Sequence, residues 1–276
     1  MRYEQTKKLS NREFKRLVGV QRHTFNQMVK VIQDTVSTKQ TRGCRSKLDS
    51  ENQVLICLQY WREYRTYFHI AQDWQVSEST VCRIVHRVES ALVSSGRFRL
   101  EGKKSLLNTS QKPKTVVMDV TESPIERPKS GQKRFYSGKK GQHTLKSQFV
   151  IDLETLQVRC VVNDSGRRHD FKLFVNSKVR FHPDTHSLED SGYQGIAKFH
   201  ANSHLPRKKP RGGKLSKEDK RFNRDLARRR VVVEHINRRF KVFRILSQRY
   251  RNRRKRFVLR CHLIAGIYNY ELLNAG

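Results

Sequence analysis

The segment from Thr115 to Pro124 places an acidic residue inside a run of β-favouring residues. It reads Thr-Val-Val-Met-Asp-Val-Thr-Glu-Ser-Pro, which predicts a strand at Thr115–Val120 and an end of strand structure at Pro124. Burying a carboxylate such as that of Asp119 is costly unless a cation or a donor pairs with it. Asp119 is therefore the first candidate metal ligand.

The segments after Asp119 predict a mixed sheet with an antiparallel meander. Strands are expected at Arg134–Ser137 and Leu145–Asp152, around a glycine-containing turn at 138–141, and at Val158–Val162. Further along the chain, Leu188 leads to Asp190, which is followed by the glycine-bounded turn 191–195. A second acid is thus expected at the end of a strand.

A long helix is predicted from about Lys217 towards Arg244. Its apolar stripe at helical spacing is Val232, Ile236, Phe240 and Phe243. Glu234 is two residues from the stripe, with Arg230 and Arg238 four residues to either side. Periodicity alone leaves two readings open, an exposed glutamate paired with arginines or a site residue.

The first hundred residues predict helices. Ser10–Glu13 has the form of a capping box before a short amphipathic helix that Gly19 ends, a second helix begins near Thr24, and 37–49 is polar and predicts a linker. Residues 51–93 predict three helices, with a short turn and Ser77 as N-cap before the third, which is the helix-turn-helix pattern. The outward residues of the third helix, candidates for DNA contact, are Ser79, Thr80, Arg83, His86 and Arg87. A three-helix bundle with solvated cations is the alternative.

The charge of the chain indicates a polyanionic partner. The formal net charge is +34 with a pI near 10.6, and so large an excess of Lys and Arg in a compact fold favours a nucleic-acid partner. A ribosomal or chromatin-like binding protein would also be basic. Outside the helix-turn-helix, the candidate phosphate contacts are Lys139, Lys140, Arg207, Lys208, Lys209, Arg251, Arg253 and Arg254.

The cysteines and apolar segments bear on the cellular compartment. The five cysteines are scattered without a C-x-x-C pair, so neither a zinc site nor a disulfide framework is indicated. The sequence has no apolar signal-peptide core and no run of about 18 apolar residues. We therefore expect a cytoplasmic protein.

Eight segments carry motifs of a known family: 118–128, 137–140, 143–146, 169–174, 190–195, 230–235, 250–257 and 263–269. These motifs resemble those of bacterial insertion-sequence transposases, with the greatest similarity to insertion-sequence family five in the Harbinger-like branch of the DDE superfamily. The resemblance covers nearly the whole chain in the family's order, and Glu189 departs from it where a small apolar residue is expected.

The resemblance implies an α/β fold in which an RNase H-like catalytic domain, a mixed sheet with flanking helices, follows an all-α helix-turn-helix domain. The expected division is an N-terminal helical segment at 1–45, a DNA-binding domain at 46–110 and an endonuclease domain at 111–276. Asp119 matches the first acid of the family triad, Asp190 the second, 71 positions later, and Glu234 the third, a further 44 positions on.

The chemistry that follows from the resemblance is phosphoryl transfer on DNA. Three clustered carboxylates repel one another unless divalent cations neutralise them, and hard oxygen ligands favour Mg²⁺, with Mn²⁺ as a substitute. Two ions about 3.5–4 Å apart would activate a water or a 3′-hydroxyl and stabilise the leaving oxygen. The resemblance thus predicts a transposase that binds terminal inverted repeats in double-stranded DNA, cleaves and transfers strands, and acts as a homodimer or higher oligomer. The alternatives are a related nuclease without transfer activity and a non-enzymatic DNA-binding regulator.

Other titratable residues compete for roles at the site. Glu122, three residues after Asp119, would point to the opposite face of a continuing strand and could orient a ligand or hold a neighbouring cation. Asp170 could either support the site or cap a short helix that follows it. His143 and His235 are further candidate donors near the DNA.

Overall fold

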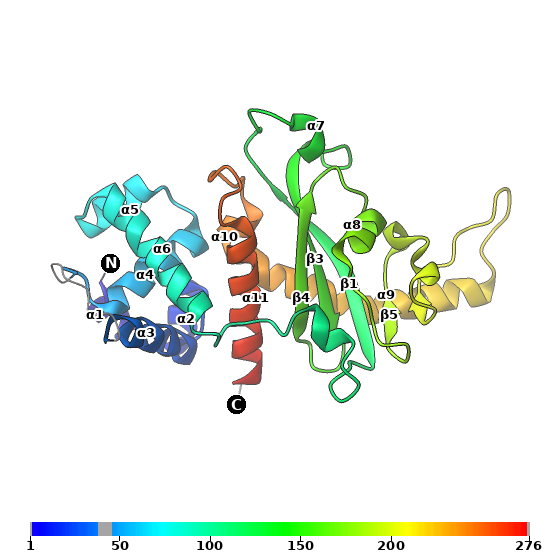
Figure 1. Ribbon diagram of the computed structural model, residues 1–276, viewed down its shortest axis with the longest axis horizontal. Coiled ribbons are helices and arrows are strands. Elements are labelled where there is room, and N and C mark those ends of the chain that lie inside the picture. Colours follow the sequence, from blue (N-terminus) through cyan, green and yellow to red (C-terminus); the bar gives the residue numbers. More distant parts are fainter. Residues whose placement is uncertain (1, 38–45, 275–276) are drawn as a thin grey trace. The chain divides into compact units, whose positions relative to one another are not determined.

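The computed structural model describes residues 2–37 and 46–274 (Figure 1). The chain divides into two compact units. The first comprises Met1–Arg99, Phe240–Gln248 and His262–Gly276, and the second comprises Leu100–Arg239 and Arg249–Cys261. Most of the predicted linker, including Gly43 and Cys44, lies outside the described residues. Within them, no helix is both long enough and apolar enough to cross a membrane.

The first unit is built from helices. The capping box predicted at Ser10 is present, since its side chain accepts from the Glu13 backbone N–H, and the helix that follows ends at Gly19 with φ of 89°. The helices are α1 (Tyr3–Thr6), α2 (Asn11–Val18), α3 (Arg22–Ser37), α4 (Ser50–Glu63), α5 (Tyr67–Trp74), α6 (Glu78–Ser94) and α10 (Arg244–Ser247), and α11 (Phe257–Leu273) contributes its residues from His262 onward.

Helices α4, α5 and α6 form the predicted helix-turn-helix. Ser77 is the N-cap of α6 and its hydroxyl accepts from the Thr80 backbone N–H, as the sequence predicts. The apolar faces of the three helices are buried together, with Trp61 and Trp74 almost fully enclosed. The Trp61 indole donates to the buried Glu89 carboxylate at 3.0 Å, so that this core has a satisfied polar pair.

The second unit contains a six-stranded mixed sheet (Figure 1). Strand β1 pairs antiparallel with β3 and parallel with β5, while β3 also pairs antiparallel with β4, which confirms the predicted meander. The strands are β1 (Thr115–Pro124), β2 (Tyr136–Ser137), β3 (Gln142–Asp152), β4 (Val158–Ser165), β5 (His186–Leu188) and β6 (Ser203–His204). The helices are η1 (Lys103–Leu106), α7 (Gln132–Phe135), α8 (Asp170–Ser177), η2 (Ser191–Tyr193), η3 (Ile196–Lys198) and most of α9 (Lys217–Lys241).

Several strand boundaries differ from the prediction, among them the start of β3 at Gln142 and the end of β4 at Ser165. Strand β1 continues beyond Val120 to Pro124, because β3 pairs with it along its whole second half. The strand expected at 134–137 is only two residues long, and the preceding residues form α7 after Gly131, whose φ of 66° starts a helical turn. The turn at 138–141 nevertheless joins β2 to β3 as a hairpin, as expected.

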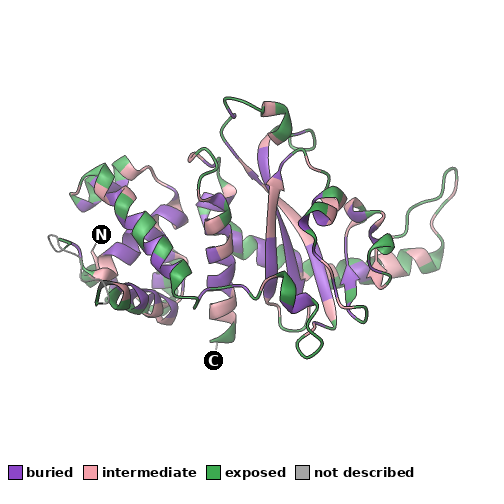
Figure 2. Cartoon of the chain, viewed as in Figure 1, coloured by how far each residue is buried: buried purple, intermediate pink, exposed green. Residues whose placement is uncertain are grey.

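Successive residues of β1 face opposite sides of the sheet. Val116 and Met118 belong to a buried cluster that includes Phe174 of α8, whereas Asp119 contacts α9. Helices α8 and α9 therefore cover opposite faces, and the strands between them are largely buried (Figure 2). The inner stripe of α9 runs through Leu226, Val233, Ile236 and Phe240, so the predicted stripe was wrong at Val232, which is only partly buried.

Candidate active site

Asp119 lies in β1 and both of its carboxylate oxygens face α9. Oδ2 accepts a hydrogen bond from Asn237 Nδ2 at 3.0 Å, and Oδ1 is 3.7 Å from Arg230 Nη2. The pKa of Asp119 is raised to about 6, chiefly by burial; the positive charge of Arg230 opposes this shift and the negative charge of Asp190 adds to it. Asp119 is thus a poorly hydrated carboxylate whose present counter-charge is an arginine.

Asp190 is held beside Asp119 by the parallel pairing of their strands. Val117 of β1 is paired with Leu188 of β5, and each acid comes two residues after its strand's paired position. Asp190 Oδ1 accepts from the Gly192 backbone N–H at 2.8 Å, which caps the short helix η2. The predicted acid at a strand end next to a glycine-bounded turn is therefore present.

Glu234 is on the helix that contacts Asp119, but its side chain is exposed. It comes four residues after Arg230 and three before Asn237, so it shares their side of α9. The sequence spacing left open an ion pair between Arg230 and Glu234. In the structure Arg230 pairs with Asp119 instead, at 3.7 Å. Across 2–37 and 46–274, no three acidic, histidine or cysteine side chains are gathered closely enough to hold a metal ion. The structure brings together Asp119, Asp190 and the helix that carries Glu234, but not the three carboxylates.

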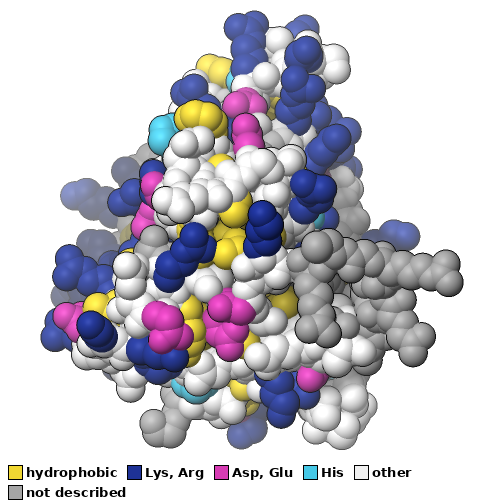
Figure 3. Space-filling model, turned by 90° about the vertical axis from the view of Figure 1, so that its left-hand side faces the viewer, with side chains coloured by type: hydrophobic (Ala, Val, Ile, Leu, Met, Phe, Trp, Pro, Cys, Tyr) yellow, Lys and Arg dark blue, Asp and Glu magenta, His cyan; other side chains and the backbone are white. Residues whose placement is uncertain are grey.

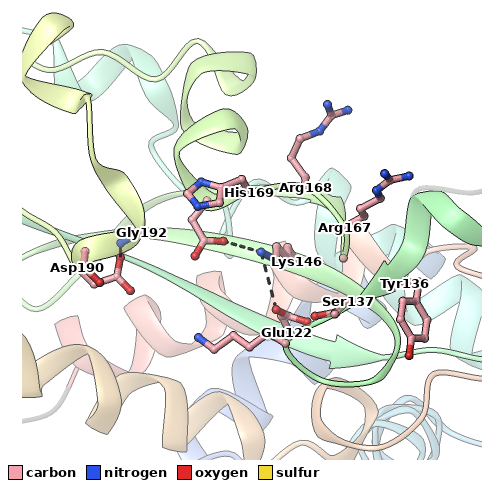
Figure 4. Close-up of a pocket in the computed structure, with 14 residues that line it drawn as sticks. Glu122, Tyr136, Ser137, Lys146, Arg167, Arg168, His169, Asp190 and Gly192 are labelled. Atoms are coloured by element: carbon pink, nitrogen blue, oxygen red, sulfur yellow. Dashed lines mark hydrogen bonds and ion pairs between the residues drawn. The ribbon is translucent and has the colours of Figure 1, made fainter.

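Glu122 and Asp170 are joined by a lysine that we did not single out in the sequence (Figure 4). Lys146 Nζ lies 2.6 Å from Asp170 Oδ1 and 3.8 Å from Glu122 Oε1, and its side chain is only 10% exposed. Glu122 also accepts from the Thr144 hydroxyl at 2.7 Å. The prediction that Glu122 could hold a neighbouring cation is confirmed. The sequence signal that could have indicated this ion pair is a lysine within a β-rich segment, since Lys146 lies opposite Glu122 in the neighbouring strand.

The N-cap of α8 is His169 rather than Asp170, so the capping alternative for Asp170 was wrong. Asp170 is instead the first residue of the helix, and the buried ammonium of Lys146 determines its position. A Cβ placed on Gly192 would lie 2.9 Å from Asp190 Oδ1 and 3.1 Å from Asp170 Oδ2. A side chain at position 192 would therefore have to displace at least one of these two carboxylates.

These residues line a hollow of about 340 Å³ next to Asp190 (Figure 4). Its floor holds the Glu122–Lys146–Asp170 group, and its rim carries Arg167 and Arg168, whose side chains extend outward. Of the three acids predicted from the sequence, Asp190 lines this hollow, whereas Asp119 and Glu234 do not.

Glu189, the residue that departs from the family pattern, is fully buried. Neither carboxylate oxygen makes a hydrogen bond of normal geometry. Burial raises the pKa of Glu189 to about 7, so the acid occupies the kind of enclosed environment in which the resemblance leads us to expect an apolar residue.

The predicted contact residues of the helix-turn-helix lie on the outer side of α6. Ser79, Arg83, His86 and Arg87 are exposed and Thr80 is partly buried. The Arg83 guanidinium donates back to the Ser79 carbonyl and hydroxyl, both at 3.2 Å, which holds it along the helix. On the face drawn in Figure 3, Lys and Arg side chains are widespread and acidic side chains form small groups between them.

The other predicted phosphate contacts differ in their exposure and in the residues that they contact. Arg207 pairs with Asp219 at 2.7 Å and stacks over Phe222, and Arg254 stacks over Phe135 at 4.2 Å. The remaining predicted cations are exposed, except for the partly buried Arg251; the exposed ones are Lys139, Lys140, Lys208, Lys209 and Arg253. The candidate donor His235 is exposed on α9, and His143 stacks edge-on against Tyr136.

Comparison with known proteins agrees with this architecture. Residues 118–269 match the family model described as DDE superfamily endonuclease, and residues 46–98 match the helix-turn-helix of DDE superfamily endonuclease. The chain therefore belongs to the DDE superfamily of endonucleases, and it is an enzyme that acts on DNA rather than a non-enzymatic regulator.

Among its relatives is a protein of Microchaete diplosiphon described as "Probable transposase for insertion sequence element IS702". The two are 56% identical over 272 residues, which cover 99% of each chain. Membership of the insertion-sequence transposases is thereby shown, and the predicted fold class, a mixed α/β endonuclease domain preceded by an all-α helix-turn-helix, is confirmed.

Proposed function

We propose that this enzyme binds the terminal inverted repeats of its own mobile element, cleaves the DNA there and transfers the freed strand to a target. The observation that carries the proposal is the adjacency of Asp119 and Asp190 beneath the helix that presents Glu234. The proposed catalytic residues are Asp119, Asp190 and Glu234.

Endonucleases of this superfamily generally use divalent metal ions, and two of the three proposed ligands, Asp119 and Asp190, already lie beside each other. Asp119 and Asp190 offer hard oxygen donors, and their mutual repulsion in a buried setting is the condition that a divalent cation relieves. We propose Mg²⁺, held by Asp119 and Asp190 with Glu234 from the adjoining turns of α9. The bound ion would supply Lewis-acid activation of the attacking oxygen and charge stabilisation for the leaving one.

The chain's own residues prepare this site. Asn237 donates to Asp119 Oδ2 and so orients the carboxylate, while the Gly192 backbone N–H orients Asp190. Lys146 keeps Asp170 and Glu122 apart from Asp119 on the other face of the sheet. The two acids that must bind the cation are thereby positioned before DNA arrives, which reduces the reorganisation that the reaction requires.

Recognition of the repeat is assigned to α6, because its exposed residues follow a turn of helix-turn-helix form. The proposed DNA contacts remain those predicted from the sequence, on α6, in the 138–141 turn, in the 207–214 loop and around 251–254. We also retain the domain division 1–45, 46–110 and 111–276, a homodimer or higher oligomer that joins two element ends, and a cytoplasmic location at the nucleoid.

The test is Asp119→Asn assayed for Mg²⁺-dependent cleavage of a duplex that carries the element's end. Cleavage should be lost while DNA binding is retained, because the substitution removes a charge from β1 and leaves α6 intact. The matched control is Asp184→Asn, an exposed acid paired with Lys112. Unchanged cleavage in Asp119→Asn would refute the proposed site. Cleavage without strand joining in the native protein would identify a nuclease instead.

A further inference from the structure

A second hollow of about 620 Å³ lies beside the one at Asp190, and its lining carries no acidic residue. We call it the basic groove. It is lined by Gly131, Lys133, Arg134, Ser165, Arg167, Arg168, His169 and Lys172. All of these positions belong to the second unit, and none of them was among the DNA contacts predicted from the sequence.

The cations of the basic groove are accessible. Lys133, Arg134, Arg167 and Lys172 are all exposed, and Arg168 is partly buried because it pairs with Asp164 at 3.1 Å. So many positive side chains around one concave surface repel one another, and a bound polyanion would relieve this repulsion. A solvated surface would more commonly intersperse both signs of charge.

The two walls of the groove are fixed to each other by the backbone. The Arg167 N–H donates to the Arg134 carbonyl at 3.3 Å, which joins the 165–169 loop to the end of α7. The Gly166 N–H donates to the Thr144 carbonyl at 2.9 Å, and a Cβ at Gly166 would lie 2.0 Å from the Thr144 hydroxyl oxygen. The loop that carries the cations is thus packed closely on β3, so these backbone contacts fix the position of the groove walls.

The basic groove adjoins the hollow of about 340 Å³ that Asp190 lines. Arg167, Arg168 and His169 line both hollows, and Asp190 lies at the end of the smaller hollow away from Arg167 (Figure 4). A sugar-phosphate backbone that follows the cations from Lys133 and Lys172 is therefore led over Arg167 to Asp190.

We propose that the basic groove binds the phosphate backbone of the DNA segment that flanks the cleaved phosphate. This inference rests on the proposed function, because it takes Asp190 as part of the cleavage site. The ligand class is a nucleic-acid strand recognised by its phosphates, without base readout. The groove contributes affinity and aligns the strand, whereas α6 contributes sequence selection.

The experiment compares two triple variants with the same change in net charge. The groove variant is Lys133→Gln/Arg167→Gln/Lys172→Gln. The control is Lys104→Gln/Lys178→Gln/Lys198→Gln, whose lysines are exposed in the same unit and line neither hollow. Lys172 and Lys178 make a close match, since one lies in the first turn of α8 and the other directly after its last residue. Both variants should keep the native melting temperature, and the single variant Arg167→Gln serves if the groove triple does not.

The first readout is the dependence of DNA affinity on salt, measured with a duplex that carries the element's end and its flank. Each lost phosphate contact lowers the slope of log K against log salt by about 0.9, so the groove triple should lose roughly 2 to 3 from the slope. The control triple should keep the native slope. Equal slopes in the two triple variants would overturn the proposal.

The second readout locates the contact on the DNA. Neutral methylphosphonates replace the phosphates next to the cleaved one, in the native protein and in the groove triple. If the groove holds these phosphates, the replacements weaken native binding several-fold and leave the groove triple unaffected. Additive losses would overturn the placement beside Asp190. The proposed function is judged separately, because Asp119→Asn should lose cleavage and keep the native salt slope whichever way the groove experiment ends.

Discussion

Arg230 Nη2 lies 3.7 Å from Asp119 Oδ1, so a residue of α9 supplies the positive charge next to the first proposed catalytic acid. A divalent cation that binds Asp119 must compete with this guanidinium for the same carboxylate. Since the pair is only partly exposed, at 20% for Arg230 and 25% for Asp119, water screens the competition incompletely. The resting state of the site is therefore an ion pair within the protein.

Removing the charge of Arg230 should tighten cation binding. Arg230→Gln is expected to bind Mn²⁺ about tenfold more tightly at pH 8, where Asp119 is ionised, which corresponds to roughly 1.4 kcal/mol of relieved competition. Calorimetry on the DNA-free protein measures it. Arg238→Gln, an exposed arginine on the same helix, is the control and should leave the affinity unchanged. Weaker binding in Arg230→Gln would contradict the competition.

Cation binding should also depend on pH through Asp119. Burial raises the pKa of this carboxyl to about 6, and only its ionised form is a ligand. Mn²⁺ affinity should accordingly be constant above pH 7 and fall by up to about tenfold per pH unit below pH 6. A titration that stays flat down to pH 4.5 would place the ligand elsewhere.

Lys146 should be essential for stability. Its ammonium is the shared partner of Glu122 and Asp170, whose side chains are 8% and 22% exposed. Lys146→Met leaves two enclosed carboxylates without a counter-charge and should lower the free energy of unfolding by about 3 kcal/mol. Urea denaturation measures this loss. Lys139→Met, at an exposed turn, should change stability by less than about 0.5 kcal/mol. Equal losses in the two variants would show that the buried pair contributes nothing.

Gly192 should affect catalysis more than folding. A methyl group there would lie 2.9 Å from Asp190 Oδ1, so Gly192→Ala must push the carboxylate aside. We expect a loss of about 100-fold in cleavage rate, the scale of effect that a displacement of about 1 Å can produce. Gly138→Ala, where no atom lies within 4 Å of the added Cβ, is the matched control. Native activity in Gly192→Ala would mean that Asp190 tolerates displacement.

Glu189 should make stability fall as pH rises. The folded protein keeps a proton on this buried carboxyl up to about pH 7, whereas the unfolded chain releases it near its ordinary pKa of 4.5. The stability that the folded protein gains by keeping this carboxyl protonated is complete below pH 4.5 and is lost as pH rises through about 7. Glu189→Gln should therefore be more stable than the native protein at pH 8, by about 3 kcal/mol, and similar to it at pH 4.5. Thermal denaturation at the two pH values tests this; equal differences at both would exclude the titration.

Much of the fold could be predicted from local sequence. The capping box at Ser10, the N-cap at Ser77 and the acid-bearing strand at Asp119 were all predicted, because caps and periodicity depend on neighbours a few residues away. The prediction of a strand at 134–137 was wrong at its first two residues, which belong to α7. Its backbone enters a helical turn after Gly131, and pairing with β3 is limited to Tyr136 and Ser137.

The site divides in the same way. The sequence by itself, through its motifs, picked out Asp119, Asp190 and Glu234 and the helix-turn-helix that precedes them. Only the tertiary structure decided that Arg230 pairs with Asp119, that Lys146 joins Glu122 to Asp170, and that Arg167 connects a basic groove to Asp190. Strand register and helix packing produce these arrangements: the ion pairs of Lys146 each join residues 24 positions apart and that of Arg230 joins residues 111 apart, and no local pattern encodes the distance between such residues.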